Sequence, residues 1–185
     1  MNRGILFAAL TAFVGSATAI SCRRTADPKQ LSAVDSLRTK IEAGALTLQE
    51  LDVKHYTTAD SILEAARPLF LDRFMDTLDR TTATLLGDQF VQLREAGRME
   101  SDHLVVRTQA EMMVGRLEAL RMDLISGAID DEAGATAIQR ERTKANDLLP
   151  MVDQVIANYQ AMQRVLERQA LVDSILMSTL EHQYR

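Results

Sequence analysis

The sequence has few of the residues that usually carry covalent or aromatic chemistry. Among its 185 residues there is one cysteine, no tryptophan and only three prolines. A lone cysteine cannot form a disulfide within the chain, and no Gly-rich phosphate loop, haem-attachment motif or zinc-binding spacing is present. We therefore expect a protein that is not an enzyme, with no catalytic, cofactor-binding or metal-binding residue.

Positive charge is also in short supply. The chain has 21 Lys and Arg residues against 26 Asp and Glu, which gives a formal net charge of -5. Nucleic-acid binding requires a basic face. This balance argues against a nucleic-acid partner.

The beginning of the chain has the layout of an export signal. Met1-Asn2-Arg3 is a short positive start, Gly4 to Val14 is an uncharged apolar run, and small residues follow at 15–19. The apolar run is shorter than the roughly 20 residues that cross a hydrocarbon core. We therefore interpret this segment as a processing signal and exclude it from the folded domain.

The single cysteine follows this segment directly, in Ala19-Ile20-Ser21-Cys22. These residues resemble the lipobox of bacterial lipoproteins, in which a small residue precedes the cut and a cysteine follows it. The resemblance implies a signal peptide at 1–21, lipid attachment at Cys22 and a lipidated linker at 22–27. Two or three acyl chains on one residue make a stable anchor. Two other outcomes stay open: cleavage after Ala19, which releases a secreted protein, and an uncut membrane helix.

The lipoprotein resemblance also implies a location. In enterobacterial lipoproteins an aspartate directly after the cysteine retains the protein at the inner membrane, and in this chain Arg23 stands there. The implied location is the cell envelope, at the outer membrane and facing the periplasm.

Residues 28–185 are expected to form one all-α domain, because helix-forming residues dominate and no long alternating stretch suggests a strand. Asp27-Pro28 is typical of a helix start, which predicts a helix over 28–43. Thr47 and Glu50 fit a capping box at the start of a second helix. Pro68 predicts a kink or a break in that second helix.

The clearest helical pattern lies in the second half of the chain. Apolar residues recur at spacings of four and three at Val106, Ala110, Met113, Leu117, Leu120 and Leu124. Ser126-Gly127 ends this helix, and the acidic residues from Asp130 predict the start of the next one. A second apolar register runs from Ile138, includes Glu141, and passes through Pro150 toward Leu180, which predicts one long bent helix.

These patterns together predict an elongated antiparallel bundle. It would contain three to four long helices with coiled-coil-like packing and kinks near Pro68 and Pro150. Short turns are expected near 44–46, 97–100 and 127–130.

Two carboxylate-x-x-histidine pairs raise the question of a metal site. They are Asp52-x-x-His55 and Glu100-x-x-His103, and di-iron bundles use Glu-x-x-His pairs on two helices. Acidic residues are common enough in this chain for such pairs to arise by chance. We interpret His103 as a partly exposed residue in the first turn of its helix, and His182 as a solvated residue near the chain end.

Our leading hypothesis is a lipid-anchored helical-bundle protein that binds another protein or itself by helix packing, without catalysis. Its partners would be the membrane, through the anchor, and a protein. One alternative is a periplasmic holdase-like chaperone that uses some of the nine methionines. The other is a metal-binding bundle that uses His55 and His103.

Overall fold

The molecule is built from helices alone in the part of the chain that the structure describes. A computed structural model describes residues 26–72 and 79–183, and the side chains of all of these except 69–72 and 179–183. Within those ranges there are six helices and no strand: α1 (Pro28–Glu50), α2 (Lys54–Asp72), α3 (Arg80–Arg94), α4 (Ala96–Ser126), α5 (Asp131–Glu167) and α6 (Gln169–Gln183). The prediction of an all-α helical bundle is confirmed.

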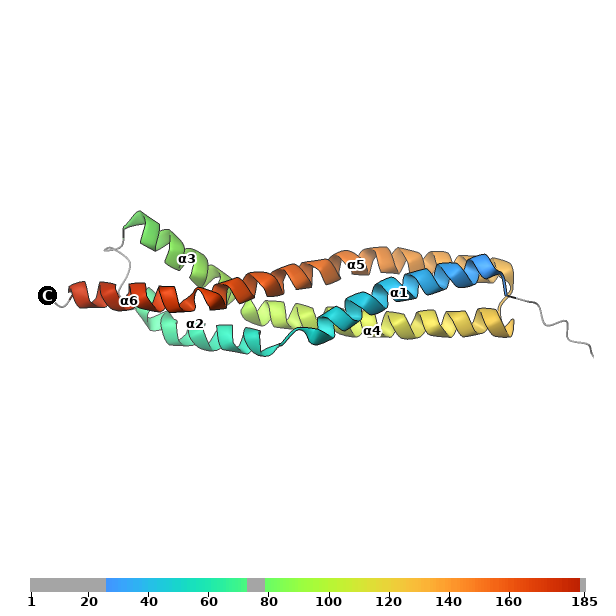
Figure 1. The fold of residues 1–185 in the computed structure, drawn as a ribbon, viewed down its shortest axis with the longest axis horizontal. Coiled ribbons are helices and arrows are strands. Elements are labelled where there is room, and N and C mark those ends of the chain that lie inside the picture. The colour runs from blue at the N-terminus through green and yellow to red at the C-terminus, as the bar shows by residue number, and fades with distance from the viewer. Residues whose placement is uncertain (1–25, 73–78, 184–185) are drawn as a thin grey trace, which may run out of the picture.

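The helices make three antiparallel passes along one elongated molecule (Figure 1). The first pass is α1 followed by α2, the second is α3 followed by α4, and the third is α5 followed by α6. Each pass is interrupted once, at residues 51–53, at Glu95 and at Arg168 respectively. The longest helix, α5, has 37 residues, which correspond to a length of about 55 Å.

The helix ends that the sequence marks most strongly lie where they are expected. The Asp27 carboxylate accepts a hydrogen bond of 2.9 Å from the backbone of Lys29 at the start of α1. Asp130 caps α5 in the same way, by accepting a bond of 2.8 Å from Ala133. Gly127 ends α4 with a φ of 71°, in the left-handed region that favours glycine. The turn at 127–130 is therefore confirmed.

The predicted turn at 44–46 is wrong, because α1 continues without interruption to Glu50. Gly44 lies inside α1 where it faces α5, and a Cβ there would be 3.2 Å from Cγ1 of Val152. The hydroxyl of Thr47 bonds to the carbonyl of Ala43 at 3.0 Å instead of capping a new helix. Packing against α5 therefore outweighs the local signal for a helix end.

Two further boundaries differ from the prediction. At Pro68, where a kink or a break was expected, helix α2 continues to Asp72, which excludes the break. Helix α4 begins at Ala96, so the predicted turn at 97–100 lies inside a helix. Ala96 and Met99 are buried there, which extends the apolar face of α4 toward its start. The third pass runs through Pro150 as predicted, but it is interrupted at Arg168.

Two clusters of buried side chains follow one another along the molecule. The proximal core, nearest to residue 26, joins α1, α4 and α5, and it contains every residue of the predicted repeat from Val106 to Leu124. The distal core joins α2 to parts of α3, α4 and α5. It consists of Tyr56, Ala59, Leu63, Leu93, Ala96, Met99, Tyr159, Met162 and Val165. The two cores meet where the first pass is interrupted.

Candidate functional site

The predicted lipid attachment residue, Cys22, lies outside the described residues, as does the predicted signal peptide at 1–21. The described chain begins at residue 26, inside the predicted linker. None of the helices in the described ranges combines the length and the apolarity that a membrane crossing requires.

His103 is fully buried between the two cores, so the prediction of partial exposure is wrong. Its helix begins at Ala96, which places His103 in the second turn and in phase with the buried repeat. Its Nε2 lies 2.8 Å from the carbonyl oxygen of Leu48 in the last turn of α1. The final carbonyls of a helix lack partners within the helix. The imidazole N–H therefore satisfies one of these acceptors where α1 ends.

His55 also lies at this interruption, at the start of α2. Its Nδ1 is 2.8 Å from the hydroxyl oxygen of Tyr159 on α5. The same hydroxyl accepts a bond of 3.2 Å from the backbone N–H of Asp52, and Nδ1 of His55 also lies 3.0 Å from the carbonyl oxygen of Asp52. The Asp52 carboxylate in turn accepts a bond of 3.0 Å from the backbone of Lys54. These bonds hold the connection between α1 and α2 against α5.

A chain of four rings connects α2, α4 and α5 at the junction of the two cores. Ring centroids are 5.3 Å apart for His55 and Tyr159, 6.0 Å for Tyr159 and Tyr56, and 5.9 Å for Tyr56 and His103. All three contacts are edge-to-face, the geometry that aromatic pairs prefer. Burial, together with nearby Tyr159 and Glu100, raises the pKa of Tyr56 to about 12.

The structure thus brings both carboxylate-x-x-histidine pairs to one junction. Each histidine commits one ring nitrogen to a hydrogen bond that joins two helices. Among the described residues, no group of three or more His, Cys, Asp or Glu side chains is placed to hold a metal ion. His182 lies in α6, and its side chain is outside the described ones.

Gln89 has the same role at the interruption of the third pass. It is 1% exposed, and its Nε2 donates to the carbonyl of Val165 at 2.9 Å and to Oε1 of Gln169 at 3.0 Å. Val165 lies in the last turn of α5, so this bond again satisfies a carbonyl at a helix end. Sequence reasoning missed Gln89, although its spacing from Leu86 and Leu93 places it on the buried face of α3.

Glu141 occupies the buried position in the register of α5 that the sequence predicts. Its carboxylate lies 3.0 Å from Nζ of Lys144, 3.2 Å from Nε of Arg116 and 3.3 Å from Nε of Arg140. Burial acts to raise the pKa of Glu141, but hydrogen bonds from Lys144 and Arg116 outweigh it, and the pKa is lowered. One buried carboxylate therefore gathers three cations at the surface between α4 and α5.

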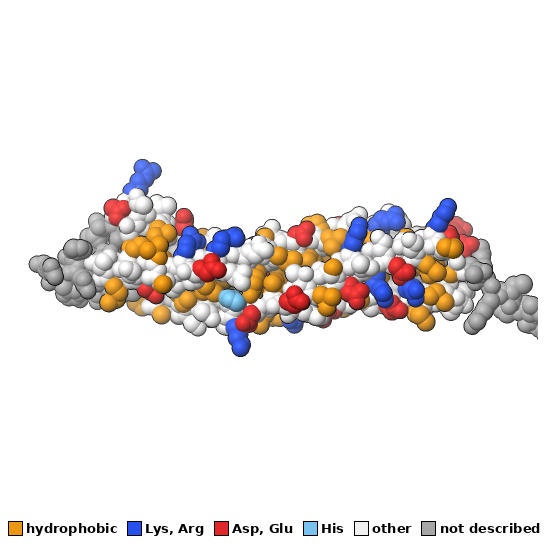
Figure 2. Space-filling model, viewed as in Figure 1, with side chains coloured by type: hydrophobic (Ala, Val, Ile, Leu, Met, Phe, Trp, Pro, Cys, Tyr) orange, Lys and Arg blue, Asp and Glu red, His pale blue; other side chains and the backbone are white. Residues whose placement is uncertain are grey.

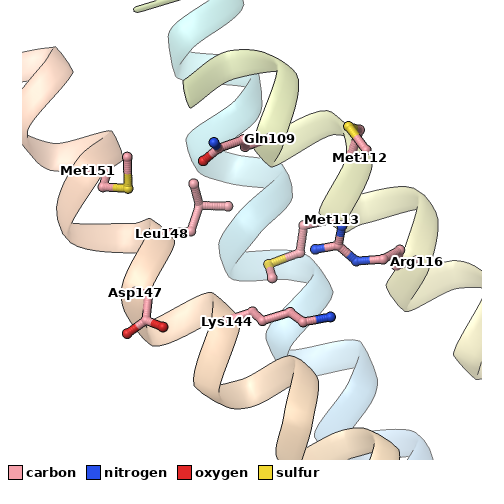
Figure 3. Close-up of a pocket in the computed structure, with 8 residues that line it drawn as sticks. All are labelled: Gln109, Met112, Met113, Arg116, Lys144, Asp147, Leu148 and Met151. Atoms are coloured by element: carbon pink, nitrogen blue, oxygen red, sulfur yellow. The ribbon is translucent and has the colours of Figure 1, made fainter. Parts of the chain in front are cut away.

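Three hollows lie along the surface where α4 meets α5. They have volumes of about 320 Å³ between 102–106 and 150–158, 290 Å³ between 109–116 and 144–151, and 270 Å³ between 116–123 and 129–141. Figure 3 shows the middle hollow, with Met113 and Leu148 between the two helices and α1 behind them. We call these hollows together the α4–α5 groove.

Apolar side chains reach the surface along the molecule, among charged ones (Figure 2). In the α4–α5 groove these are Val105, Met112 and Met151, which are 50%, 59% and 42% exposed. Such residues on a charged surface are suited to binding another apolar surface. No protein-family model, curated protein or solved structure matches this chain.

Proposed function

We propose that this protein is a lipid-anchored module of the bacterial cell envelope that binds another protein through the side of its helical bundle. It catalyses no reaction and binds no nucleic acid. The observation that carries this proposal is the α4–α5 groove, where apolar side chains 42% to 59% exposed lie above a packed core. A surface of this kind accepts a helix from a partner.

The lipid anchor is supported by the position of the cysteine relative to the folded domain. Five residues lie between Cys22 and Pro28, where α1 begins, and such a linker spans at most about 20 Å. The bundle would therefore stay close to the membrane that holds the acyl chains. Confinement to a surface raises the effective concentration of a partner in the same membrane or beside it. We place the protein at the outer membrane, facing the periplasm.

A structural role for the buried polar groups supports a non-catalytic function. His103 and Gln89 donate to carbonyls at helix ends, and Glu141 joins α5 to α4 through Arg116. Polar groups buried in this way set the alignment of neighbouring helices. The exposed apolar side chains of the groove, in contrast, make no such polar contact between helices.

The anchor is tested by intact-mass spectrometry of the protein extracted from the membrane fraction. We expect a chain that begins at Cys22 and carries the mass of acyl chains. A Cys22→Ser variant should lose both the added mass and the membrane association. A native polypeptide that begins at Ile20, or one with an unmodified thiol, would contradict the anchor.

A holdase-like chaperone is the second candidate, and one observation favours it. Met112 and Met151 line the same hollow from opposite helices (Figure 3). Methionine is flexible and polarisable, so paired methionines can adapt to clients of different shape. Suppression of the aggregation of several unrelated denatured clients would favour the chaperone. Activity on none of them would leave the specific partner as the better explanation.

A further inference from the structure

The methionines whose side chains the structure describes fall into two classes of exposure. Three are at most 6% exposed and belong to the two cores: Met99, Met113 and Met162. Four are between 42% and 61% exposed: Met112, Met122, Met151 and Met177. No described methionine side chain lies between these ranges. We call the two sets the core methionines and the surface methionines.

The two sets differ in what a chemical change at the sulfur would cost. None of the surface methionines belongs to the proximal or the distal core. A polar group added there stays in contact with water, so it loses no hydration. The core methionines are packed on all sides, and a polar oxygen added there would be buried without a hydrogen-bond partner. The fold therefore tolerates oxidation at the surface methionines and not at the core ones.

The thioether of methionine reacts with peroxides to give a sulfoxide. An S–O bond forms as the O–O bond of the peroxide breaks. The sulfur is oxidised by two electrons and the peroxide is reduced, and the second peroxide oxygen leaves as water (or an alcohol) with a proton relayed by the solvent. The peroxide must reach the sulfur, so exposure selects which methionines react.

The middle hollow of the α4–α5 groove contains both classes side by side. Met112 and Met113 are neighbours in the sequence, yet they are 59% and 1% exposed. Met112 and Met151 reach the hollow from α4 and α5, and Met113 lies between the two helices (Figure 3). Arg116 follows Met112 by one turn of α4 and lines the same hollow. Its guanidinium can donate an N–H to a sulfoxide oxygen at Met112.

We infer that the surface methionines are oxidation sites at which peroxides are reduced while the helical bundle stays folded. This inference goes beyond the proposed function, because it requires neither a lipid anchor nor a protein partner. Oxidation of Met112 and Met151 also makes two apolar positions of the groove polar. Methionine sulfoxide reductases return the thioether, so the same sites can react repeatedly.

Graded hydrogen peroxide added to the purified full chain tests the inference, with peptide mass spectrometry to follow each methionine. In the folded protein we expect the surface methionines to gain oxygen about tenfold faster than the core ones. Met112 and Met113 give the sharpest comparison, because their sequence surroundings are the same. In denaturant the two should react at equal rates. Equal rates in the folded protein, or no reaction at the surface methionines, would overturn the inference.

Circular dichroism then measures whether the fold survives. The thermal midpoint should be unchanged after oxidation of the folded protein, and lower after oxidation in denaturant followed by refolding, because the core methionines then carry oxygen as well. A lowered midpoint after oxidation of the folded protein alone would overturn the inference.

A variant with Met99→Leu, Met113→Leu and Met162→Leu sharpens this measurement. Leucine has no thioether and is close to methionine in volume. The variant oxidised in denaturant should therefore refold to the midpoint that it has without peroxide. A lower midpoint in that comparison would mean that the surface sulfoxides themselves disrupt the bundle, and it would also overturn the inference. The proposed function is tested separately, since neither the anchor nor a partner enters these measurements.

Discussion

The proximal core and the distal core are filled by different side chains. The apolar side chains of the proximal core are all aliphatic or methionine, and the helices that supply them, α1, α4 and α5, pass one another without interruption. The distal core contains Tyr56 and Tyr159, and the helices around it start or end at breaks in all three passes. Regular heptad spacing supports long helices. Each break leaves backbone N–H and C=O groups without partners in the helix, and other groups must form hydrogen bonds with them.

The interruptions differ in how their backbone groups are satisfied. Opposite the break at 51–53, His103 bonds to the carbonyl of Leu48, and Tyr159 accepts the N–H of Asp52. Opposite the break at Arg168, Gln89 bonds to the carbonyl of Val165. Two of the three buried polar side chains in the described part of the chain, His103 and Gln89, thus lie where the distal half departs from regular helices. The comparison predicts that the two halves respond differently to substitution.

The largest effect is expected from loss of volume in the proximal core. Leu117→Ala removes a side chain with no exposed surface, and should lower the free energy of unfolding by about 2–5 kcal/mol. Leu86→Ala in α3 should cost less, because Leu86 belongs to neither core. Guanidinium denaturation followed by circular dichroism measures both values. An equal or larger loss for Leu86→Ala would show that the distal half is packed as tightly.

The next effect concerns the hydrogen bond at the first interruption. His103→Leu leaves the carbonyl of Leu48 without its donor, and should lower the free energy of unfolding by about 1–3 kcal/mol. His103→Gln retains a side-chain N–H and serves as the matched control. Amide hydrogen exchange across 49–56 should become faster in the leucine variant only. Unchanged exchange there would mean that His103 does not hold this junction.

A smaller effect is expected for the carboxylate that joins α4 to α5. Glu141→Gln removes the charge at the centre of three ion pairs, and should cost about 1–2 kcal/mol at neutral pH. The pKa of Glu141 is lowered from its ordinary value of about 4.5 in the folded protein. This stabilisation is therefore present above pH 4.5 and is lost as the pH falls through the lowered folded pKa.

Urea denaturation of the Glu141→Gln variant and the parent protein at pH 7 and pH 3.5 checks this dependence. The difference between the two proteins should shrink at the lower pH. Glu42→Gln changes an exposed carboxylate on α1 and should leave stability unchanged at both values. A difference for Glu141→Gln that does not vary with pH would exclude the ionised carboxylate as its cause.

The smallest effect near neutral pH is expected for Tyr56→Phe. The hydroxyl of Tyr56 is buried without a hydrogen-bond partner in the described part of the chain, so its removal should change stability by less than about 0.5 kcal/mol. Because the folded pKa is raised to about 12 from 10, the stabilising neutral form persists below pH 10 and is lost between pH 10 and 12. At pH 11 the variant should be more stable than the parent protein by about 1 kcal/mol.

Unfolding midpoints measured between pH 8 and pH 12 test the tyrosine prediction. The two proteins should have the same midpoint up to pH 10 and diverge above it. Parallel curves throughout would mean that Tyr56 ionises as easily in the folded chain as in the unfolded one.

The candidate site was only partly predictable from the sequence. The buried register that contains Glu141 follows from helical spacing alone. Among the three cations around Glu141, Arg116 could not be assigned, because it comes from another helix. His103 and Gln89 could not be assigned as donors either, since their acceptors lie 55 and 76 residues away in the sequence.

The sequence by itself determined the helical class of this protein, the heptad register of α4 and α5, and the turn between them. These features depend on residues within one or two turns of each other, such as the cap at Asp130 and the left-handed Gly127. Only the tertiary structure decided where the passes break. Helix α1 passes Gly44 because α5 packs there, and it ends where His103 reaches Leu48. A capping residue at a helix end contributes about 1 kcal/mol to stability. The packing of one helix against another sums many contributions of that size, so it outweighs the local signals that would end a helix.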